Sequence, residues 1–202
     1  KRWGQPIIIE SRPGGNFLIA ARACAESPPD GYTLCALTPE SLVQGPLLYK
    51  NAGYSYDAAF APISQLFYNT LVWAVYPEIG VTSFRELAAT AKKKPLAFAY
   101  ITLANRLLID RFNKVSGTDI VPVPTRGGSD VLNGFISGNI SIGVASVITF
   151  LPQVQDRKLV PIVIDGIDRS PLLPDVPTLA EVGFPGTIVR NYWGLVAPRG
   201  VP

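Results

Sequence analysis

Short apolar runs alternate with amphipathic segments along the whole chain. Runs rich in β-branched and aromatic residues predict strands at 6–11, 32–38, 60–67, 70–76, 96–102, 120–125, 140–146 and 158–165. Apolar residues at helical spacing predict helices at 16–27, 40–49, 83–94, 103–115, 128–138 and 148–155. Alternation of this kind is typical of α/β proteins whose sheets are mainly parallel and covered by helices.

The segment 83–94 has the clearest helical pattern. Ser83 is the expected N-cap, and Glu86 is expected to complete a capping box with it. The apolar face of this helix consists of Phe84, Leu87, Ala88 and Ala91. We therefore expect that face to pack against the rest of the fold.

The composition is that of an ordered globular protein, since 48% of the 202 residues are hydrophobic and 16% are charged. No apolar run reaches the roughly 18 residues that a membrane-spanning helix needs, so we do not expect the chain to span a membrane. Lys and Arg outnumber Asp and Glu by only 18 to 15, which argues against a nucleic-acid partner. Because the sequence has no Met and no apolar leader, we expect a processed or truncated chain.

One residue type that many enzymes and metal sites use is missing. The chain has no histidine, which excludes a Ser-His-Asp triad, a Cys-His pair and a histidine-based metal site. It also has no G-x-S-x-G elbow, no P-loop and no G-x-G-x-x-G motif. We therefore predict no catalysis, no metal and no cofactor, although a lysine or carboxylate acting alone stays an alternative. For the two cysteines, Cys24 and Cys35, we expect buried free thiols; the alternative is that they face each other.

Sheets of this class bind ligands at the carboxyl ends of their strands, where loops enter helices. Three such loops are rich in small and polar residues: Thr38, Pro39, Glu40 and Ser41; Tyr100, Ile101 and Thr102; and Thr125, Arg126, Gly127, Gly128, Ser129 and Asp130. In the third loop, two glycines and an arginine precede a helix whose first amides are free to bind an anion such as a carboxylate. The alternative is a tight turn with Ser129 or Asp130 as the N-cap.

Several motifs carry a resemblance that runs from end to end of the chain. The most specific are PDGYTL, LPDVPT-x-x-E-x-G-x-P-G and W-G-L-x-A-P-x-G-x-P, together with ESRPGG, YSYDAAFAPIS and GTDIVPVPTRGG. In this order they resemble the Bug-type substrate-binding receptors of tripartite tricarboxylate transporters.

The resemblance implies a periplasmic solute-binding protein with the type 2 periplasmic binding protein fold. It implies a partial first lobe at 1–76, a second lobe at 77–190 and a return through the hinge to the first lobe at 191–202. The expected ligand is a small organic acid, which the receptor delivers by cleft closure to the membrane permease subunits of the transporter. The family's ligand loops map onto the first and third loops above, and its strand-end loop maps onto Ala145 and Ser146.

The chain also departs from the family pattern. Many relatives have an Asp where this chain has Ala145 and Ser146, so a ligand amine is not expected, and Arg106 hints at an extra anionic group. The usual first strand and final helices are missing, which indicates truncation at both ends. We therefore expect exposed apolar surface on Ile7, Ile8 or Ile9, unless other residues or a second chain cover it.

Two other function classes fit the predicted fold. A ligand-sensing domain of a transcription regulator shares it, but such a domain adjoins a helix-turn-helix that this chain lacks. An α/β enzyme without histidine is the other alternative.

Overall fold

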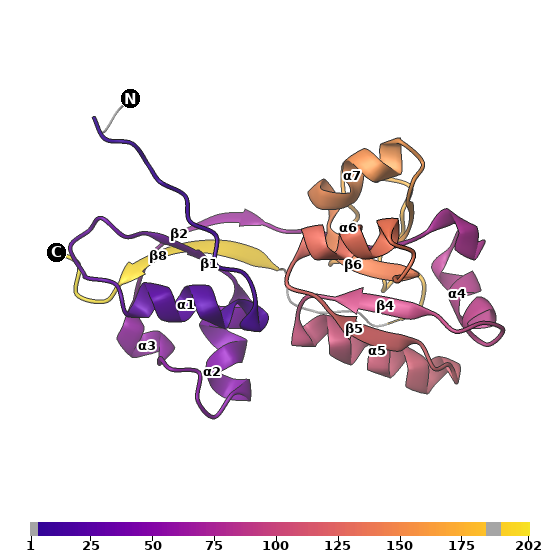
Figure 1. Cartoon of the computed structure of the whole chain (residues 1–202), viewed down its shortest axis with the longest axis horizontal. Helices are drawn as coiled ribbons and strands as arrows, with labels where there is room; N and C mark the ends of the chain where they lie inside the picture. The colour runs from indigo at the N-terminus through magenta and orange to yellow at the C-terminus, as the bar shows by residue number, and fades with distance from the viewer. Residues whose placement is uncertain (1–3, 185–190) are drawn as a thin grey trace. The chain divides into compact units, whose positions relative to one another are not determined.

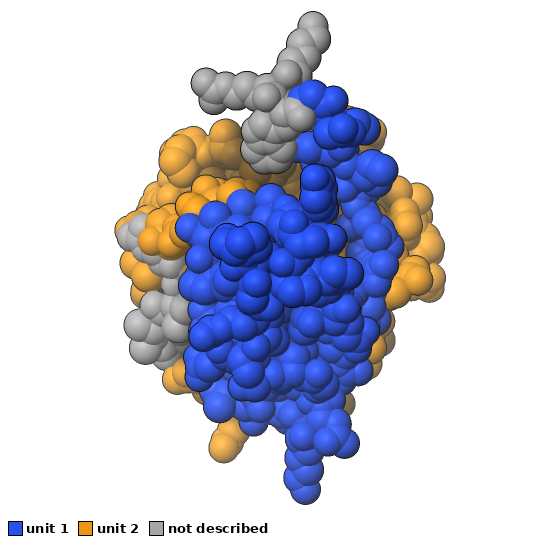
Figure 2. Space-filling model, turned by 90° about the vertical axis from the view of Figure 1, so that its left-hand side faces the viewer, with its two compact units in different colours: residues 1–63, 195–202 blue, residues 64–194 orange. Residues whose placement is uncertain are grey.

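The computed structural model describes residues 4–184 and 191–202. The chain divides into two compact units, one of residues 1–63 and 195–202 and the other of residues 64–194, which Figure 2 colours separately. Each unit has a sheet of its own, although β2 and β8 contain residues of both units. The sequence placed the first change of unit at residue 76. In the structure, the strand over 71–75 belongs to the sheet of the second unit. The other expected boundary, residue 190, lies outside the described residues.

The second unit contains a five-stranded sheet in the order β5-β4-β6-β3-β7. Its strands are β3 (Leu71–Val75), β4 (Ala97–Tyr100), β5 (Val121–Pro124), β6 (Ile142–Ser146) and β7 (Val160–Asp165). β4 is parallel to β5 and to β6, whereas β3 is antiparallel to β6 and to β7. Only β3 therefore opposes the common direction, and the predicted α/β fold with a mainly parallel sheet is confirmed.

Helices cover both faces of this sheet (Figure 1). They are α4 (Phe84–Ala91), α5 (Leu103–Ser116), α6 (Gly128–Ile136) and α7 (Val147–Gln155), with a short 3-10 turn, η3 (Pro77–Ile79), before α4. Along β3, Trp73 and Val75 enter a cluster with α4 and α5, while Val72 and Ala74 enter a second cluster with α6 and α7. This alternation is the two-residue period of a strand that is buried on both faces.

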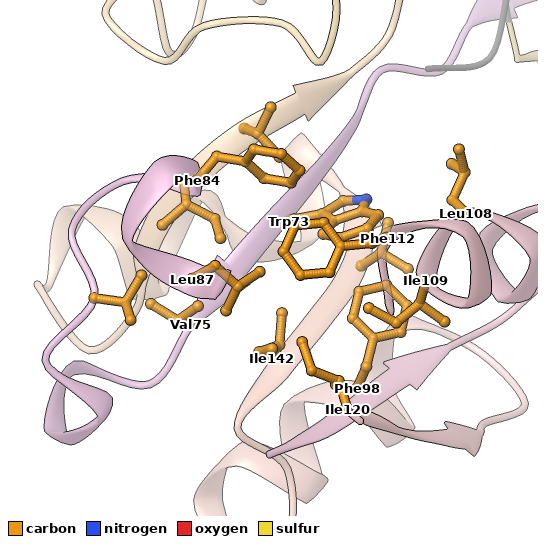
Figure 3. Close-up of a cluster of buried hydrophobic side chains, with 14 of the residues drawn as sticks. Trp73, Val75, Phe84, Leu87, Phe98, Leu108, Ile109, Phe112, Ile120 and Ile142 are labelled. Atoms are coloured by element: carbon orange, nitrogen blue, oxygen red, sulfur yellow. The ribbon is translucent and has the colours of Figure 1, made fainter. Parts of the chain in front are cut away.

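Trp73 lies at the centre of the first of these clusters (Figure 3). Its ring centroid is 4.6 Å from that of Phe98 and 5.8 Å from that of Phe84. Phe84 and Leu87 of α4 are buried in the same cluster, so the predicted apolar face of this helix is confirmed.

The expected capping box of α4 is wrong. Ser83 is the N-cap residue, but its side chain makes no capping hydrogen bond. The Glu86 carboxylate instead accepts hydrogen bonds from the backbone N–H of Thr82 at 2.9 Å and from its hydroxyl at 3.0 Å. Glu86 thus reaches one residue further back than the capping-box pattern assumes.

The first unit contains a three-stranded sheet in the order β1-β8-β2. Its elements are η1 (Gly15–Phe17), α1 (Leu18–Ala25), β1 (Cys35–Leu37), the π-helix η2 (Glu40–Gln44), α2 (Gly45–Leu48), α3 (Tyr56–Ala59), β2 (Phe60–Tyr68) and β8 (Tyr192–Pro198). Buried side chains of α1, β1 and β8, such as Leu18, Leu37 and Val196, form its core.

The predicted strand at 6–11 is wrong. Residues 6–14 form no helix or strand, because no strand of the described chain pairs with them. Ile7, Ile8 and Ile9 are 72%, 87% and 90% exposed. The expected apolar exposure at these residues is confirmed.

Cys24 and Cys35 form a disulfide, so the expectation of free thiols is wrong. Cys24 is on the buried side of α1, and Cys35 is the first residue of β1. The intervening turn includes Asp30, whose carboxylate accepts a hydrogen bond from the Tyr32 N–H at 2.9 Å. This turn reverses the chain and leaves the two Cα atoms 6.2 Å apart, which suits a disulfide.

Candidate functional site

Three parallel strands of the second unit end at the same edge of the sheet. β4, β5 and β6 are followed there by the N-termini of α5, α6 and α7. The structure therefore brings together the three predicted segments of this unit, namely Tyr100 to Thr102, Thr125 to Ser129, and Ala145 with Ser146. Each helix N-terminus carries roughly half a positive charge, so this edge attracts anions.

The start of α6 offers free backbone donors. The N–H groups of Asp130 and Val131 donate to the Gly127 carbonyl at 3.1 and 3.3 Å. The N–H groups of Gly128 and Ser129 have no acceptor among residues 4–184 and 191–202. Two adjacent amides without acceptors at a helix N-terminus are suited to a carboxylate or phosphate oxygen.

Arg126 is already engaged with Asp130. Its Nε lies 2.9 Å from the Asp130 carboxylate, and its backbone N–H donates to the same carboxylate at 3.2 Å. These hydrogen bonds, led by the guanidinium, lower the pKa of Asp130. The positive charge of Arg126 is therefore balanced within the unit, and the backbone amides are the donors that remain for a ligand.

The two glycines of this loop have different roles. A Cβ on Gly128 would lie 2.8 Å from Cγ2 of Thr149, so packing against α7 requires glycine here. A Cβ on Gly127 would meet nothing within 4 Å, and its φ of 176° is extended backbone that any residue adopts. The space into which a ligand can approach thus lies at Gly127.

Two of the predicted polar side chains hold the loops of this edge together. Thr102 caps α5 in a capping box with Asn105. The Thr125 hydroxyl donates to the Tyr100 carbonyl at 2.9 Å, which links the ends of β5 and β4. These two hydroxyl groups fix the backbone at the edge where the Gly128 and Ser129 amides lie.

Arg106 on α5 also has partners in its own unit. Its Nε lies 2.8 Å from the Asp110 carboxylate, and its guanidinium carbon is 6.0 Å from the centroid of the Tyr100 ring. The structure thus gives Arg106 an ion pair and a cation–π contact.

Sequence reasoning missed one acidic residue at this edge. Asp165 ends β7 and is buried, and Leu71 pairs with it on one side and with Ser146 on the other. Ala145 is buried and Ser146 is half-buried. The signal was available, because Asp165 is the last residue of the predicted strand at 158–165.

The fourth predicted segment, Thr38 to Ser41, follows β1 in the first unit. The backbone N–H and the hydroxyl of Ser41 both donate to the Thr38 carbonyl, at 3.1 and 3.0 Å. The Thr38 N–H donates back to the Ser41 hydroxyl oxygen at 3.3 Å. We call this closed set of bonds the Thr38–Ser41 ring.

The Thr38 hydroxyl itself has no hydrogen-bond partner among the described residues, although Thr38 is only 2% exposed. A buried hydroxyl without a partner destabilises a fold by about 1–3 kcal/mol. A bound ligand or an ordered water would satisfy such a group. Pro39 and Glu40 of the same segment are also buried.

The described residues contain neither a metal-ligand cluster nor a membrane-spanning helix. Nowhere in residues 4–184 and 191–202 do three metal-ligating side chains come together. In the same residues no helix has the length and apolarity to cross a membrane.

The chain is similar to known proteins over its whole length. The model of the tripartite tricarboxylate transporter family receptor matches residues 1–202. Protein BugT of Bordetella pertussis is 28% identical over 98% of this chain and 62% of its own length. The chain thus spans about three fifths of the length of the curated relatives that it matches, 61% for the first of them.

Two solved structures of Rhodopseudomonas palustris proteins contain carboxylates. Rpa4515 with adipate has a TM-score of 0.89 and 28% identity, covering 100% of this chain and 69% of that one. MatC with bound malate has a TM-score of 0.84 and 28% identity, covering 98% of this chain and 69% of that one.

Proposed function

The chain belongs to the tripartite tricarboxylate transporter receptor family, and on this premise we propose that it is a solute-binding receptor for a small carboxylated metabolite. The observation that carries the proposal is the start of α6, where the amides of Gly128 and Ser129 have no acceptor among the described residues. The adipate and malate in Rpa4515 and MatC support a ligand of this class.

In the proposed mechanism, a ligand carboxylate accepts hydrogen bonds from these two amides beside the open space at Gly127. One charge-assisted hydrogen bond contributes about 1.5–3 kcal/mol, or roughly a tenfold to hundredfold change in affinity. The family's first ligand loop maps onto the segment of Thr38, and we propose its hydroxyl as a donor to a ligand as well. From the family we propose that ligand binding stabilises a closed state of the receptor.

Delivery to a membrane permease follows from the family rather than from a contact in this chain. We propose that the permease subunits recognise the ligand-bound receptor and that the receptor acts outside the cytoplasm, in the periplasm. The Cys24–Cys35 disulfide supports this location, because disulfides persist in oxidising compartments and are rare in the cytosol. The family consists of receptors, which supports binding without catalysis.

Isothermal titration with matched ligands tests the proposal. Adipate and malate are titrated into the protein, and adipamide serves as the uncharged control for adipate. We expect one of the two acids to bind at one site per chain, and we expect adipamide not to bind, because it lacks the carboxylate charge. Equal affinity for adipate and adipamide, or no binding of either acid, would contradict a carboxylate receptor.

A further inference from the structure

Tyr54 connects the Thr38–Ser41 ring to a distant part of the first unit. The Tyr54 hydroxyl donates a hydrogen bond to the Ser41 carbonyl across 13 residues of sequence. Ser41 is completely buried, and its N–H and hydroxyl already hold the Thr38 carbonyl. The hydrogen bond to the Ser41 carbonyl thus connects the Thr38–Ser41 ring to the segment that contains Tyr54.

The surroundings of Tyr54 fix its hydroxyl in place. Its ring packs edge-on against the buried Phe60, with 5.3 Å between centroids. Burial raises the pKa of Tyr54 to about 12, so the hydroxyl remains a donor at any ordinary pH. Gly45 lies next to this hydroxyl, since a Cβ on Gly45 would be 3.4 Å from the hydroxyl oxygen.

The ring in turn determines where the Thr38 side chain lies. The Thr38 carbonyl accepts from Ser41 twice and from the Leu42 N–H at 2.9 Å, and the Thr38 N–H donates to Ser41. Because the N–H and the carbonyl of Thr38 are both hydrogen-bonded, the position of its Cα and Cβ atoms is fixed. The Thr38 hydroxyl is nevertheless left without a partner among the described residues. The hydroxyl can therefore hydrogen-bond to a bound ligand.

We propose that Tyr54 is a positioning residue for ligand binding, which acts through Ser41 to hold the Thr38 hydroxyl in place for the ligand. This inference rests on the proposed function, since it names a residue that supports the same site. It assigns to the Tyr54 hydroxyl a role in affinity beyond its contribution to folding.

A double-mutant cycle tests this role, with adipate and malate as the probes. Thr38→Val removes the hydroxyl at nearly constant volume, and Tyr54→Phe removes the bond to Ser41. Tyr56→Phe is the matched control, because Tyr56 packs against the same Phe60 at 6.5 Å. Affinity is measured at a temperature where thermal unfolding shows every variant to be folded.

We expect Tyr54→Phe to weaken binding roughly fivefold, as for the loss of one hydrogen bond, while Tyr56→Phe binds as the parent does. In the Thr38→Val background, Tyr54→Phe should add nothing, because the group that it positions is gone. A purely structural role would not produce this dependence. Unchanged binding in Tyr54→Phe, or losses that multiply in the double variant, would overturn the proposal.

Hydrogen exchange without ligand separates this inference from the proposed function. If neither probe binds the parent, the proposed function has failed. The exchange rates of the Ser41 and Leu42 amides then decide whether Tyr54 holds the ring. Faster exchange in Tyr54→Phe than in Tyr56→Phe would then show only that Tyr54 holds the ring, and equal rates would overturn the positioning role.

Discussion

Reduction of the Cys24–Cys35 disulfide is expected to destabilise the protein by about 3 kcal/mol. The two cysteines are 11 residues apart in sequence, and the chain-entropy model gives about 3 kcal/mol for a closed loop of this length. For a protein of this size the corresponding decrease in melting temperature is about 6–12 °C. The disulfide joins α1 to β1, so the decrease in stability should occur in the first unit. There β1 is followed directly by Thr38.

Urea unfolding of the parent, oxidised and reduced, is the assay. The two forms differ only in the disulfide bond, so side-chain packing is otherwise the same. The variant Cys24→Ala/Cys35→Ala is the control for direct effects of the reductant, to which it should be insensitive. Hydrogen exchange should show the loss in α1 and β1, and not in β4 of the second unit. If the oxidised and reduced forms have unfolding free energies within about 0.5 kcal/mol, the reasoning is refuted.

Two further changes test the packing and charges of the candidate site. Gly128→Ala should destabilise the protein by about 1–3 kcal/mol, because the new Cβ would lie 2.8 Å from Cγ2 of Thr149; an unchanged melting temperature would show that α7 gives way. The hydrogen bond from Arg126 lowers the pKa of Asp130. The ion pair therefore stabilises the folded state above the ordinary pKa of an aspartate. This stabilisation is lost as the pH falls through the lowered pKa. Parent and Asp130→Asn should therefore differ in urea midpoint near about pH 6 and converge near about pH 2, whereas a constant difference would contradict the linkage.

The sequence was informative where a property depends on local spacing. The apolar residues of α4 recur at helical spacing, and Phe84 and Leu87 are buried as that spacing predicts. The strand-to-helix loop at 125–129 likewise indicated the free amides that the structure shows at Gly128 and Ser129.

Properties that depend on contacts between distant segments could not be predicted in this way. The disulfide requires the turn near Asp30 to bring α1 against β1. The distinction between Gly127 and Gly128 depends on Thr149 of another helix. The hydrogen bond from Tyr54 to Ser41 joins two loops, which have no periodicity to reveal it.

Titration of Gly127→Leu with the acid that binds the parent tests the central claim most directly. The substitution leaves the amides in place and fills the open space beside them, at a position where the backbone accepts any residue. Ser129→Ala is the matched control, because it keeps its backbone N–H. We predict that Gly127→Leu binds at least roughly tenfold more weakly at an unchanged melting temperature, while Ser129→Ala binds within about twofold of the parent. Parent-like affinity in Gly127→Leu would place the carboxylate site elsewhere and contradict the account.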